Sequence, residues 1–368
     1  MEAGPRGFVF SRRWDRWFFA APVLVAVALL PLFAQLEAHE TPLWAFVLFV
    51  VAFDVSHVWA TLFRTYFDAA ERAHRRALYG LAPPLIFAVS WSLHSWDPSA
   101  FWTIAAYFAI YHFLSQDYGF VALSKARQGE RRLADYRWDR LAVWVGSLGP
   151  VLLWHASPSR RFDWFDAGEV FLVRLGPEWR SPIVVVYGSV ATLYALRQLQ
   201  RWRRDRAWNP GKLQLMALIW LRWGLGSLIE HPIASLAFIN VFHGLPFIAL
   251  VWCCAEHRWR DRAAVDKLEG FASFLTRPGR WFAFFAFLVL LGGLEELLWD
   301  GLVWRRYLPQ HGFRLSGSWQ SAAVALLALP QLLHYVLDGF IWRLDGSNPG
   351  LREALALSAS QRAERDVA

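Results

Sequence analysis

Apolar stretches of about 20 residues recur along the chain and are separated by short polar connections. This is the length that an α-helix needs to cross the hydrocarbon core of a bilayer. We therefore predict an all-α fold, a polytopic transmembrane bundle with about ten spans. The spans are expected at residues 17–36, 43–63, 78–96, 100–122, 141–157, 182–200, 213–230, 232–254, 281–299 and 319–342.

Basic residues fall mainly in alternate connections. Arginine is frequent in the N-terminal segment, in 64–77, 123–140, 197–212 and 255–280, and after residue 342, whereas 37–42, 97–99 and 230–231 have none. Two further outer loops, 158–181 and 300–318, also carry arginines. Because positively charged loops stay on the cytoplasmic side, we expect both termini there, in a bacterial cytoplasmic (inner) membrane.

Composition agrees with this picture. The 368 residues are 56% hydrophobic, and the mean hydropathy is +0.26, which is too apolar for an ordinary soluble domain. The net charge of +8 would suggest a nucleic-acid partner in a soluble protein, but here the positive-inside rule explains it and membrane lipid is the expected partner. We predict one integral membrane domain over 1–368, with a basic N-terminal segment at 1–16 and a polar tail at 344–368.

Four histidines lie inside the apolar stretches, each on a different expected helix: His57, His112, His243 and His334. All four helices should run from the outer to the inner side. Each histidine falls about eleven to fifteen residues from the outer end of its helix, a spread of about 6 Å. Since polar side chains inside a membrane are unfavourable unless paired, four imidazoles at one level predict a shared metal site. Separate structural hydrogen bonds are the alternative.

Other polar residues lie at helical spacing from these histidines. Asp54, His57, Thr61, Arg64 and Asp68 are three or four residues apart and form one stripe on a helix. Helical bundles use an imidazole and a carboxylate four residues apart to bind a metal or to orient a ligand through its second ring nitrogen.

We therefore expect the four histidines to be metal ligands. Gln116 lies four residues after His112, and Asp338 lies four residues after His334. Together with Asp54, these two side chains are expected to be further ligands or catalytic residues that orient the histidines.

The expected ligand set narrows the choice of cofactor. Neutral imidazoles with one or two carboxylates suit iron, zinc or copper. We expect non-haem iron, which uses histidine and carboxylate ligands and keeps positions open for O₂ and substrate. Paired histidines from opposing helices would instead hold a b-type haem, which stays open as the alternative. A His-Glu-x-x-His motif typical of zinc hydrolases is absent from the sequence.

Two arginines are candidate substrate-binding residues, because a guanidinium forks onto a carboxylate or phosphate. Arg64 lies at the inner interface, where snorkelling toward water is the alternative. Arg222 lies in mid-span, and Glu230 is its simplest ion-pair partner. Glu295 or Glu296, near the outer end of the ninth span, is another candidate ion-pair partner for Arg222.

Two short stretches, Asp54-Val55-Ser56-His57 and Tyr111-His112 followed by Asp117, resemble histidine-rich integral membrane oxygenases. The nearest family is the β-carotene-cleaving dioxygenases of the Brp/Blh type. The resemblance implies a polytopic helical protein with iron-binding histidines on separate spans, and it makes retinal formation one member of a wider class of reactions. The residues after His57, Val58-Trp59-Ala60-Thr61, differ from the Gly- and Pro-rich surround in that family.

The sequence thus favours a metal-dependent membrane oxidoreductase that acts on a lipophilic small molecule entering from the bilayer. An electron-donor protein is an expected partner, and nucleic acid is not. Two alternatives remain open. One is a b-type haem electron-transfer protein. The other is a proton-coupled transporter in which the histidines and carboxylates form a relay and Arg222 pairs with Glu230.

Overall fold

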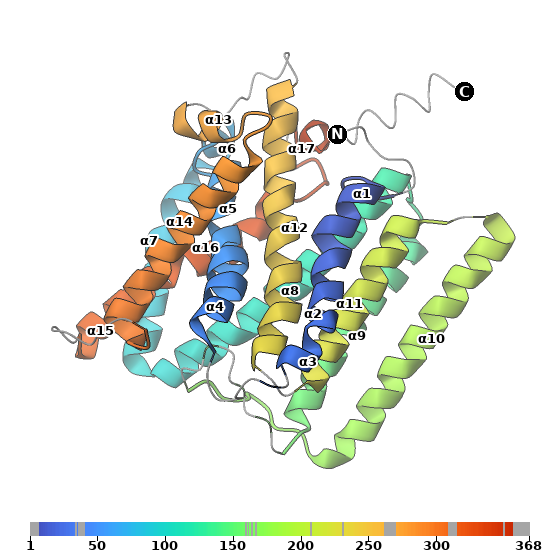
Figure 1. Ribbon diagram of the computed structural model, residues 1–368, viewed down its shortest axis with the longest axis horizontal. Helices are drawn as coiled ribbons and strands as arrows, with labels where there is room; N and C mark the ends of the chain where they lie inside the picture. Colours follow the sequence, from blue (N-terminus) through green and yellow to red (C-terminus); the bar gives the residue numbers. More distant parts are fainter. Residues whose placement is uncertain are drawn as a thin grey trace.

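The computed structural model describes residues 7–33, 41–158, 168–206, 208–229, 232–260, 270–307, 315–348 and 350–355, with single residues at 35, 160, 162 and 165. Glu230 and most of the polar tail lie outside the described residues. Within the described part, helices and connections account for the whole chain, without a strand (Figure 1). The helices are α1 (Arg12–Asp15), η1 (Arg16–Ala20), α2 (Ala21–Ala28), α3 (Leu30–Phe33), α4 (Leu43–Ala45), η2 (Phe46–Val55), α5 (Ser56–Ala60), η3 (Thr61–Arg64), α6 (Ala69–His74), α7 (Arg76–Trp96), α8 (Pro98–Gln128), α9 (Leu133–His155), η4 (Pro177–Trp179), α10 (Arg180–Asp205), α11 (Pro210–Leu228), α12 (Pro232–Arg260), α13 (Gly270–Leu275), α14 (Trp281–Trp299), η5 (Asp300–Trp304), α15 (Gly317–Leu327), α16 (Leu329–Ile341) and α17 (Leu351–Ala354).

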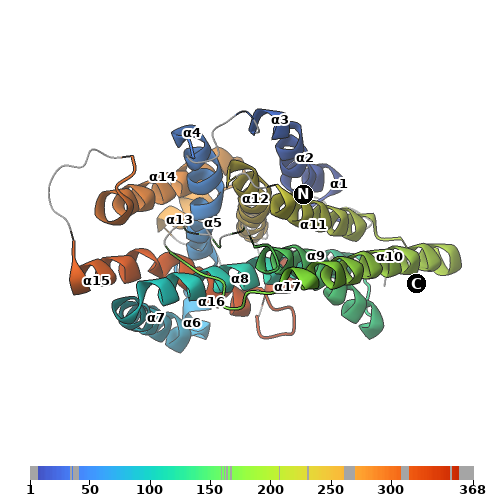
Figure 2. The same cartoon turned by 90° about the horizontal axis from the view of Figure 1, so that it is seen from below.

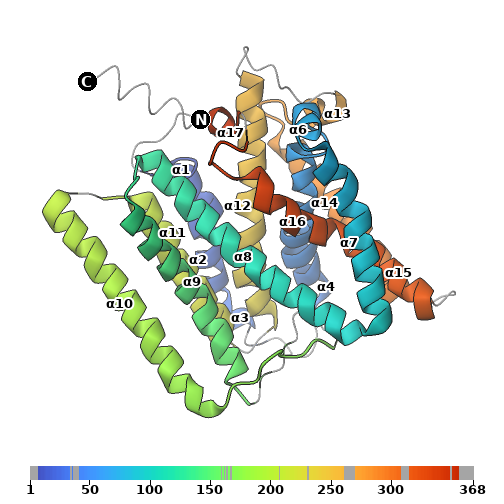
Figure 3. The same ribbon diagram turned by 180° about the vertical axis from the view of Figure 1, so that it is seen from behind.

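The long helix α12 runs through the middle of the bundle (Figure 1). It packs against η2 and α5 on one side and against α2 and α11 on the other. Helix α14 covers η2 and α5, whereas α10 lies at the edge of the molecule and contacts α9 (Figure 2). From behind, α8 crosses the bundle obliquely, with α16 beside it (Figure 3). Helices α5, α8, α12 and α16 therefore meet near the centre.

Among the described residues, four helical segments are long and apolar enough to cross a membrane: Leu43–Arg64, Pro177–Arg204, Ala237–Trp259 and Trp281–Trp304. The pair Gly317–Leu327 and Leu329–Ile341, bent by 41°, makes a fifth if it is one broken span. The expected all-helical, membrane-type fold is thus confirmed in its coarse form. The other stretches expected to span are largely helical too, but they fall short in length or in hydropathy.

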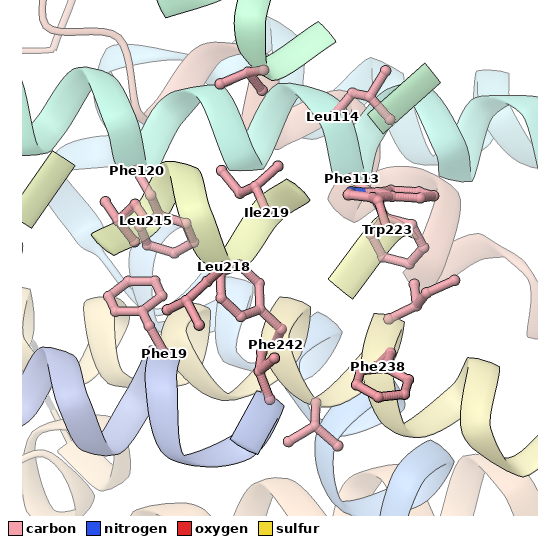
Figure 4. Close-up of a cluster of buried hydrophobic side chains, with 14 of the residues drawn as sticks. Phe19, Phe113, Leu114, Phe120, Leu215, Leu218, Ile219, Trp223, Phe238 and Phe242 are labelled. Carbon is pink, nitrogen blue, oxygen red and sulfur yellow. The ribbon is translucent and has the colours of Figure 1, made fainter. Parts of the chain in front are cut away.

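A cluster of aromatic and aliphatic side chains joins α2, α8, α11 and α12 (Figure 4). The Phe19 ring lies edge-on to Phe120, with centroids 5.0 Å apart, and packs at 5.6 Å against Phe242. Trp223 and Phe238 are fully buried beside them. Because helices in a membrane associate through close van der Waals packing, this cluster fixes the helices that carry two of the four histidines.

A second cluster, made of charged residues, ties the ends of α8, α9 and α11 together. The Lys125 ammonium donates to Asp139 at 2.5 Å, and the Lys212 ammonium donates to Glu130 at 2.8 Å. Lys212 also lies 3.5 Å from Asp139, which accepts the Tyr194 hydroxyl of α10 at 2.9 Å. Lysine is almost never fully buried unless paired, so these carboxylates are what allow both ammonium groups to enter the interior.

This cluster predicts an acid-sensitive contribution to stability. Burial alone would raise the pKa of Glu130, but the Lys212 ammonium and hydrogen bonds from Lys212 and Asn209 hold that pKa below its usual range. A carboxyl with a depressed pKa stabilises the fold above its unfolded pKa, and the contribution is lost as pH falls through the folded value. Glu130→Gln should therefore lower stability at pH 7 by about 3 kcal/mol, the usual result of unpairing a buried charge.

Thermal melting in detergent over a range of pH checks this. The gap between wild type and Glu130→Gln should close in acid, below the ordinary glutamate pKa of about 4.3. Glu178→Gln, at an exposed position outside the cluster, should melt like wild type throughout. An equal effect from both substitutions would contradict the assignment.

Candidate metal centre

The structure brings His57, His112, His243 and His334 together at the centre of the molecule, from α5, α8, α12 and α16. Each offers a ring nitrogen within 4.8 Å of the others, and all four side chains are buried. The Nε2 atom of His57 lies 3.0 Å from that of His243 and 3.1 Å from that of His334. The Nε2 atoms of His334 and His112 are also 3.1 Å apart. The predicted convergence of the four histidines is confirmed.

This geometry fits a metal ion. A first-row metal bound by imidazole lies about 2.0–2.1 Å from each nitrogen, so the corners of a tetrahedral site are about 3.4 Å apart. Three of the six nitrogen–nitrogen spacings are 3.0–3.1 Å and need to open by only a few tenths of an ångström, and the other three lie within 4.8 Å. The rings also stand edge-to-face, with interplanar angles of 69–85°, so four rings fit around one point without their bodies colliding.

The segment before His57 has an unusual backbone. Residues Phe46–Val55 form a π-helix, in which each backbone hydrogen bond spans one more residue than in an α-helix. The Ser56 hydroxyl donates to the Val51 carbonyl at 2.6 Å where this segment ends. Such irregular turns are frequent at functional sites, and this one sets the rotation at which His57 leaves the helix.

A glycine allows α12 to approach this segment. Gly244 directly follows His243, and a Cβ atom at that position would overlap the Phe53 carbonyl oxygen. The two backbones are therefore close enough to bring His243 against His57. No larger residue fits at position 244 without moving one helix away from the other.

The second ring nitrogens have partners on other helices or on the same helix. The Nδ1 atom of His334 lies 2.7 Å from the Thr61 hydroxyl, across the interface between α16 and η3. The Nδ1 atom of His57 lies 3.8 Å from Asp54 Oδ1. When Nε2 binds a metal, Nδ1 carries the proton and needs an acceptor, which Thr61 supplies for His334.

Asp338 and Gln116 were both expected near a metal ion, but their side chains contact different groups. Asp338 places one oxygen 3.6 Å from His334 Nδ1 and the other 3.9 Å from His112 Nε2, the atom that faces the centre. The Gln116 amide instead donates to the backbone carbonyl of His243 at 2.8 Å. Gln116 thus holds α8 against α12, and Asp338 is the carboxylate nearest the converging nitrogens.

Aromatic rings enclose the four imidazoles. Phe247 packs against His57 and His334, with centroids 5.7 and 5.1 Å away. Phe113 lies 3.9 Å from His243, and Tyr335 stacks on His112 at 4.5 Å. These walls exclude water and strengthen every electrostatic interaction inside.

Four further residues contact the histidines or Asp54, and the sequence did not predict these contacts, although each residue lies close to one of the four histidines along the chain. Thr61 follows His57 by four residues, Phe247 follows His243 by four, and Tyr335 directly follows His334. Asn240 precedes His243 by three and donates to Asp54 at 3.2 Å. Helical spacing from a histidine was the available signal for Thr61, Phe247 and Asn240, and Tyr335 had only its adjacency to His334. Position along one helix does not say which neighbouring helix each side chain meets.

Both candidate substrate-binding arginines are ion-paired. Arg222 is fully buried and pairs with Asp117, which also accepts the Trp223 indole N–H at 3.0 Å. Its partner is therefore Asp117, whereas Glu295 accepts the Trp59 indole N–H at 2.7 Å. Arg64 lies 3.0 Å from Glu71 and 3.5 Å from Asp68.

The contact between Thr61 and His334 predicts an effect on metal affinity. Thr61→Val keeps the shape of the side chain but removes the acceptor for His334 Nδ1–H. Loss of such an outer partner weakens metal binding by about tenfold or more. Competition with a chelator in detergent measures this. Thr65→Val, which removes a buried hydroxyl that donates to the Thr61 carbonyl, should leave affinity unchanged; equal losses would contradict the role of Thr61.

The close approach at Gly244 predicts a second effect. Gly244→Ala forces α12 away from the Phe53 carbonyl, so His243 should withdraw from the other imidazoles and bound metal should fall severalfold. Elemental analysis of the purified protein checks this. Gly119→Ala on α8, where a Cβ meets nothing within 4 Å, is the matched control. Full metal content in Gly244→Ala would show that the approach is not needed.

Comparison with known proteins adds no relative. No protein-family model matches the chain, and no characterised protein or solved structure matches it significantly. The buried four-histidine group, which could hold a metal ion, is therefore the feature from which function has to be argued.

Proposed function

We propose that the chain is a membrane-embedded oxidoreductase whose four histidines hold a non-haem iron ion and act on a lipophilic substrate. It would be a multi-pass protein of the bacterial cytoplasmic membrane, with about ten spans and both termini in the cytoplasm. The single observation that carries the proposal is the convergence of four buried histidine ring nitrogens within 4.8 Å of one another.

The spacing of the imidazoles favours a bare ion over haem. A b-type haem places its porphyrin between two axial histidines. Here all four nitrogens are mutual neighbours, with contacts of 3.0–3.1 Å along the series His243, His57, His334, His112. A porphyrin between any of these pairs would require the helices to separate.

The carboxylate beside the cluster favours iron among the metals that imidazole binds. Asp338 lies 3.9 Å from the centre-facing nitrogen of His112. Mixed imidazole and carboxylate ligands are typical of non-haem iron enzymes, and iron with open positions supplies O₂ activation at otherwise inert C–H or C=C bonds. The residues of the chain bind and orient the ion, while the aromatic walls formed by Phe247, Phe113 and Tyr335 exclude water.

The surroundings favour a lipophilic substrate. Outward-facing apolar side chains cover the helices around the centre; α14 alone exposes Leu290, Leu294, Leu297 and Leu298. A site enclosed in such a bundle is reached from the hydrocarbon side more readily than from water. Membrane lipid is thus the medium from which the substrate would be drawn.

A second function has one observation in its favour. The Nε2 contacts link four imidazoles in one unbroken series, and histidine can serve as a proton shuttle: each Nε2 would take up a proton and then hand it to the next Nε2. This arrangement suits a proton-coupled transporter. The same histidines would serve the oxidoreductase and the transporter, so the metal content of the purified protein distinguishes the two functions.

Metal analysis and the visible spectrum of the purified protein test the proposal. We expect about one iron per chain and no Soret band. His112→Ala and His334→Ala should each lower iron content at least tenfold, because four-point coordination loses a ligand. His94→Ala removes a buried histidine that bonds Ser321 instead and should keep its iron.

The results distinguish the iron oxidoreductase from the haem electron-transfer protein and from the proton-coupled transporter. Stoichiometric haem would support the electron-transfer alternative, and a metal-free protein that still moves protons would support the transporter. Wild-type iron in both ligand variants, with each variant folded by circular dichroism, would overturn the metal site.

A further inference from the structure

Arg64 has donor groups that the described residues leave unused. It is the last residue of the candidate span Leu43–Arg64, and only 3% of its side chain is exposed. Its Nη1 atom donates to Glu71 at 3.0 Å and lies 3.5 Å from Asp68. Its Nε and Nη2 atoms are buried, and neither has a hydrogen-bond partner among the described residues. The guanidinium therefore does not reach water by snorkelling.

The two unused nitrogens of Arg64 form a pair. Nε and Nη2 lie on one edge of the planar guanidinium and donate in parallel, which is the geometry that binds both oxygens of a carboxylate. Buried donors without an acceptor are unfavourable, and charged donors are more so than neutral ones. An anion with two oxygens against this edge would supply both missing acceptors.

The neighbouring carboxylates do not occupy this edge. Glu71 and Asp68 both approach Arg64 at Nη1. Each of them also pairs with a second arginine, Glu71 with Arg75 and Asp68 with Arg258. Neither acid therefore belongs to Arg64 alone, and the edge formed by Nε and Nη2 can take a further negative group.

Arg222, the other candidate substrate-binding arginine, differs from Arg64. Its unpartnered atoms are Nε and Nη1, which share no edge of the guanidinium. The Phe242 and Trp223 rings lie 4.5 and 5.1 Å from its Cζ atom, and aromatic faces attract a guanidinium. For Arg64 the Trp342 ring lies 6.0 Å away, at the outer limit of such a contact. The unused donor pair thus distinguishes Arg64.

The position of Arg64 gives the direction of a bound molecule. Arg64 follows His57 by seven residues, so the two lie about 10 Å apart along the helix axis. The Trp342 ring beside Arg64 lies 5.8 Å from Phe247, whose ring lies 5.1 Å from His334. Apolar rings therefore connect a cation at the end of a candidate span with the histidines inside the bundle. An amphiphilic acid has the same arrangement, with a charged head at the interface and a hydrocarbon chain inside the bilayer.

We infer that Arg64 binds the carboxylate of a long-chain lipophilic acid, whose hydrocarbon chain extends along Trp342 and Phe247 toward the four histidines. The role of this acid as the substrate rests on the proposed function, whereas its binding does not require a metal. A phosphate monoester fits less well, because its second negative charge would face Asp68 and Glu71. The reacting part of the substrate would lie several bonds away from the carboxylate.

Equilibrium binding of tritiated palmitate to the purified protein in detergent tests the site. A scintillation-proximity measurement detects protein-bound ligand, and palmitate, hexadecanol and hexadecyl phosphate serve as unlabelled competitors of one chain length. Wild type should bind palmitate saturably, and hexadecanol should compete about tenfold more weakly or worse, because it lacks the charge and the second oxygen. Equal competition by hexadecanol, stronger competition by hexadecyl phosphate, or no saturable binding would overturn the inference.

Substitution of Arg64 provides a second measurement. Arg64→Gln removes the charged donor pair, while both neighbouring carboxylates keep their second arginine. It should bind palmitate about tenfold more weakly or worse, and Arg64→Lys should not restore binding, because an ammonium lacks two parallel donors. Arg76→Gln, at an exposed position at the start of α7, is the matched control and should bind like wild type. Equal losses in Arg64→Gln and Arg76→Gln, or no loss in Arg64→Gln, would contradict the site.

The outcomes distinguish this inference from the proposed function. A wild-type protein that contains iron but does not prefer palmitate to hexadecanol would overturn the acid-binding site alone. A wild-type protein that lacks iron but still prefers palmitate would overturn the proposed function alone, and the acid-binding site would stand.

Discussion

The need to satisfy buried polar groups governs this fold. An imidazole inside an apolar bundle is unfavourable unless its nitrogens find partners, and here four imidazoles find one another. Each comes from a different helix, so the cluster fixes the rotation and the height of α5, α8, α12 and α16 together. A shift of one residue along any of these helices would turn its imidazole by about 100°, and the other three imidazoles would lose the partner that it supplies.

The sequence predicted the parts of this arrangement that depend on spacing within one helix. Apolar stretches identified most of the helices, and polar residues three or four apart identified the face of each that turns inward. His57, His112, His243 and His334 stood out because they were polar residues at one depth. The number of spans was harder to predict, because several helices, such as α8 with Asp117 and Lys125, carry charges that pair inside the bundle and lower their mean hydropathy.

Contacts between helices could not be predicted in the same way. Arg222 pairs with Asp117 on α8, a partner that spacing along its own helix does not indicate. Thr61 lies on the same stripe as His57 but bonds to His334 of α16. Spacing within a helix gives the direction of a side chain relative to its own axis only. The partner depends on how two helices cross; for α12 and η2, for example, the bare backbone of Gly244 allows the close approach to Phe53.

The two carboxylates nearest the histidines are not equivalent. Asp54 meets His57 at Nδ1, behind the ring, and is itself held by the Asn240 amide. Asp338 reaches His112 at Nε2, the atom that faces the centre. An acceptor behind a ring fixes the orientation of a ligand, whereas an oxygen beside the centre-facing nitrogen can approach the ion. The same residue type at similar helical spacing therefore serves two purposes, and the difference follows from the helix against which each carboxylate packs.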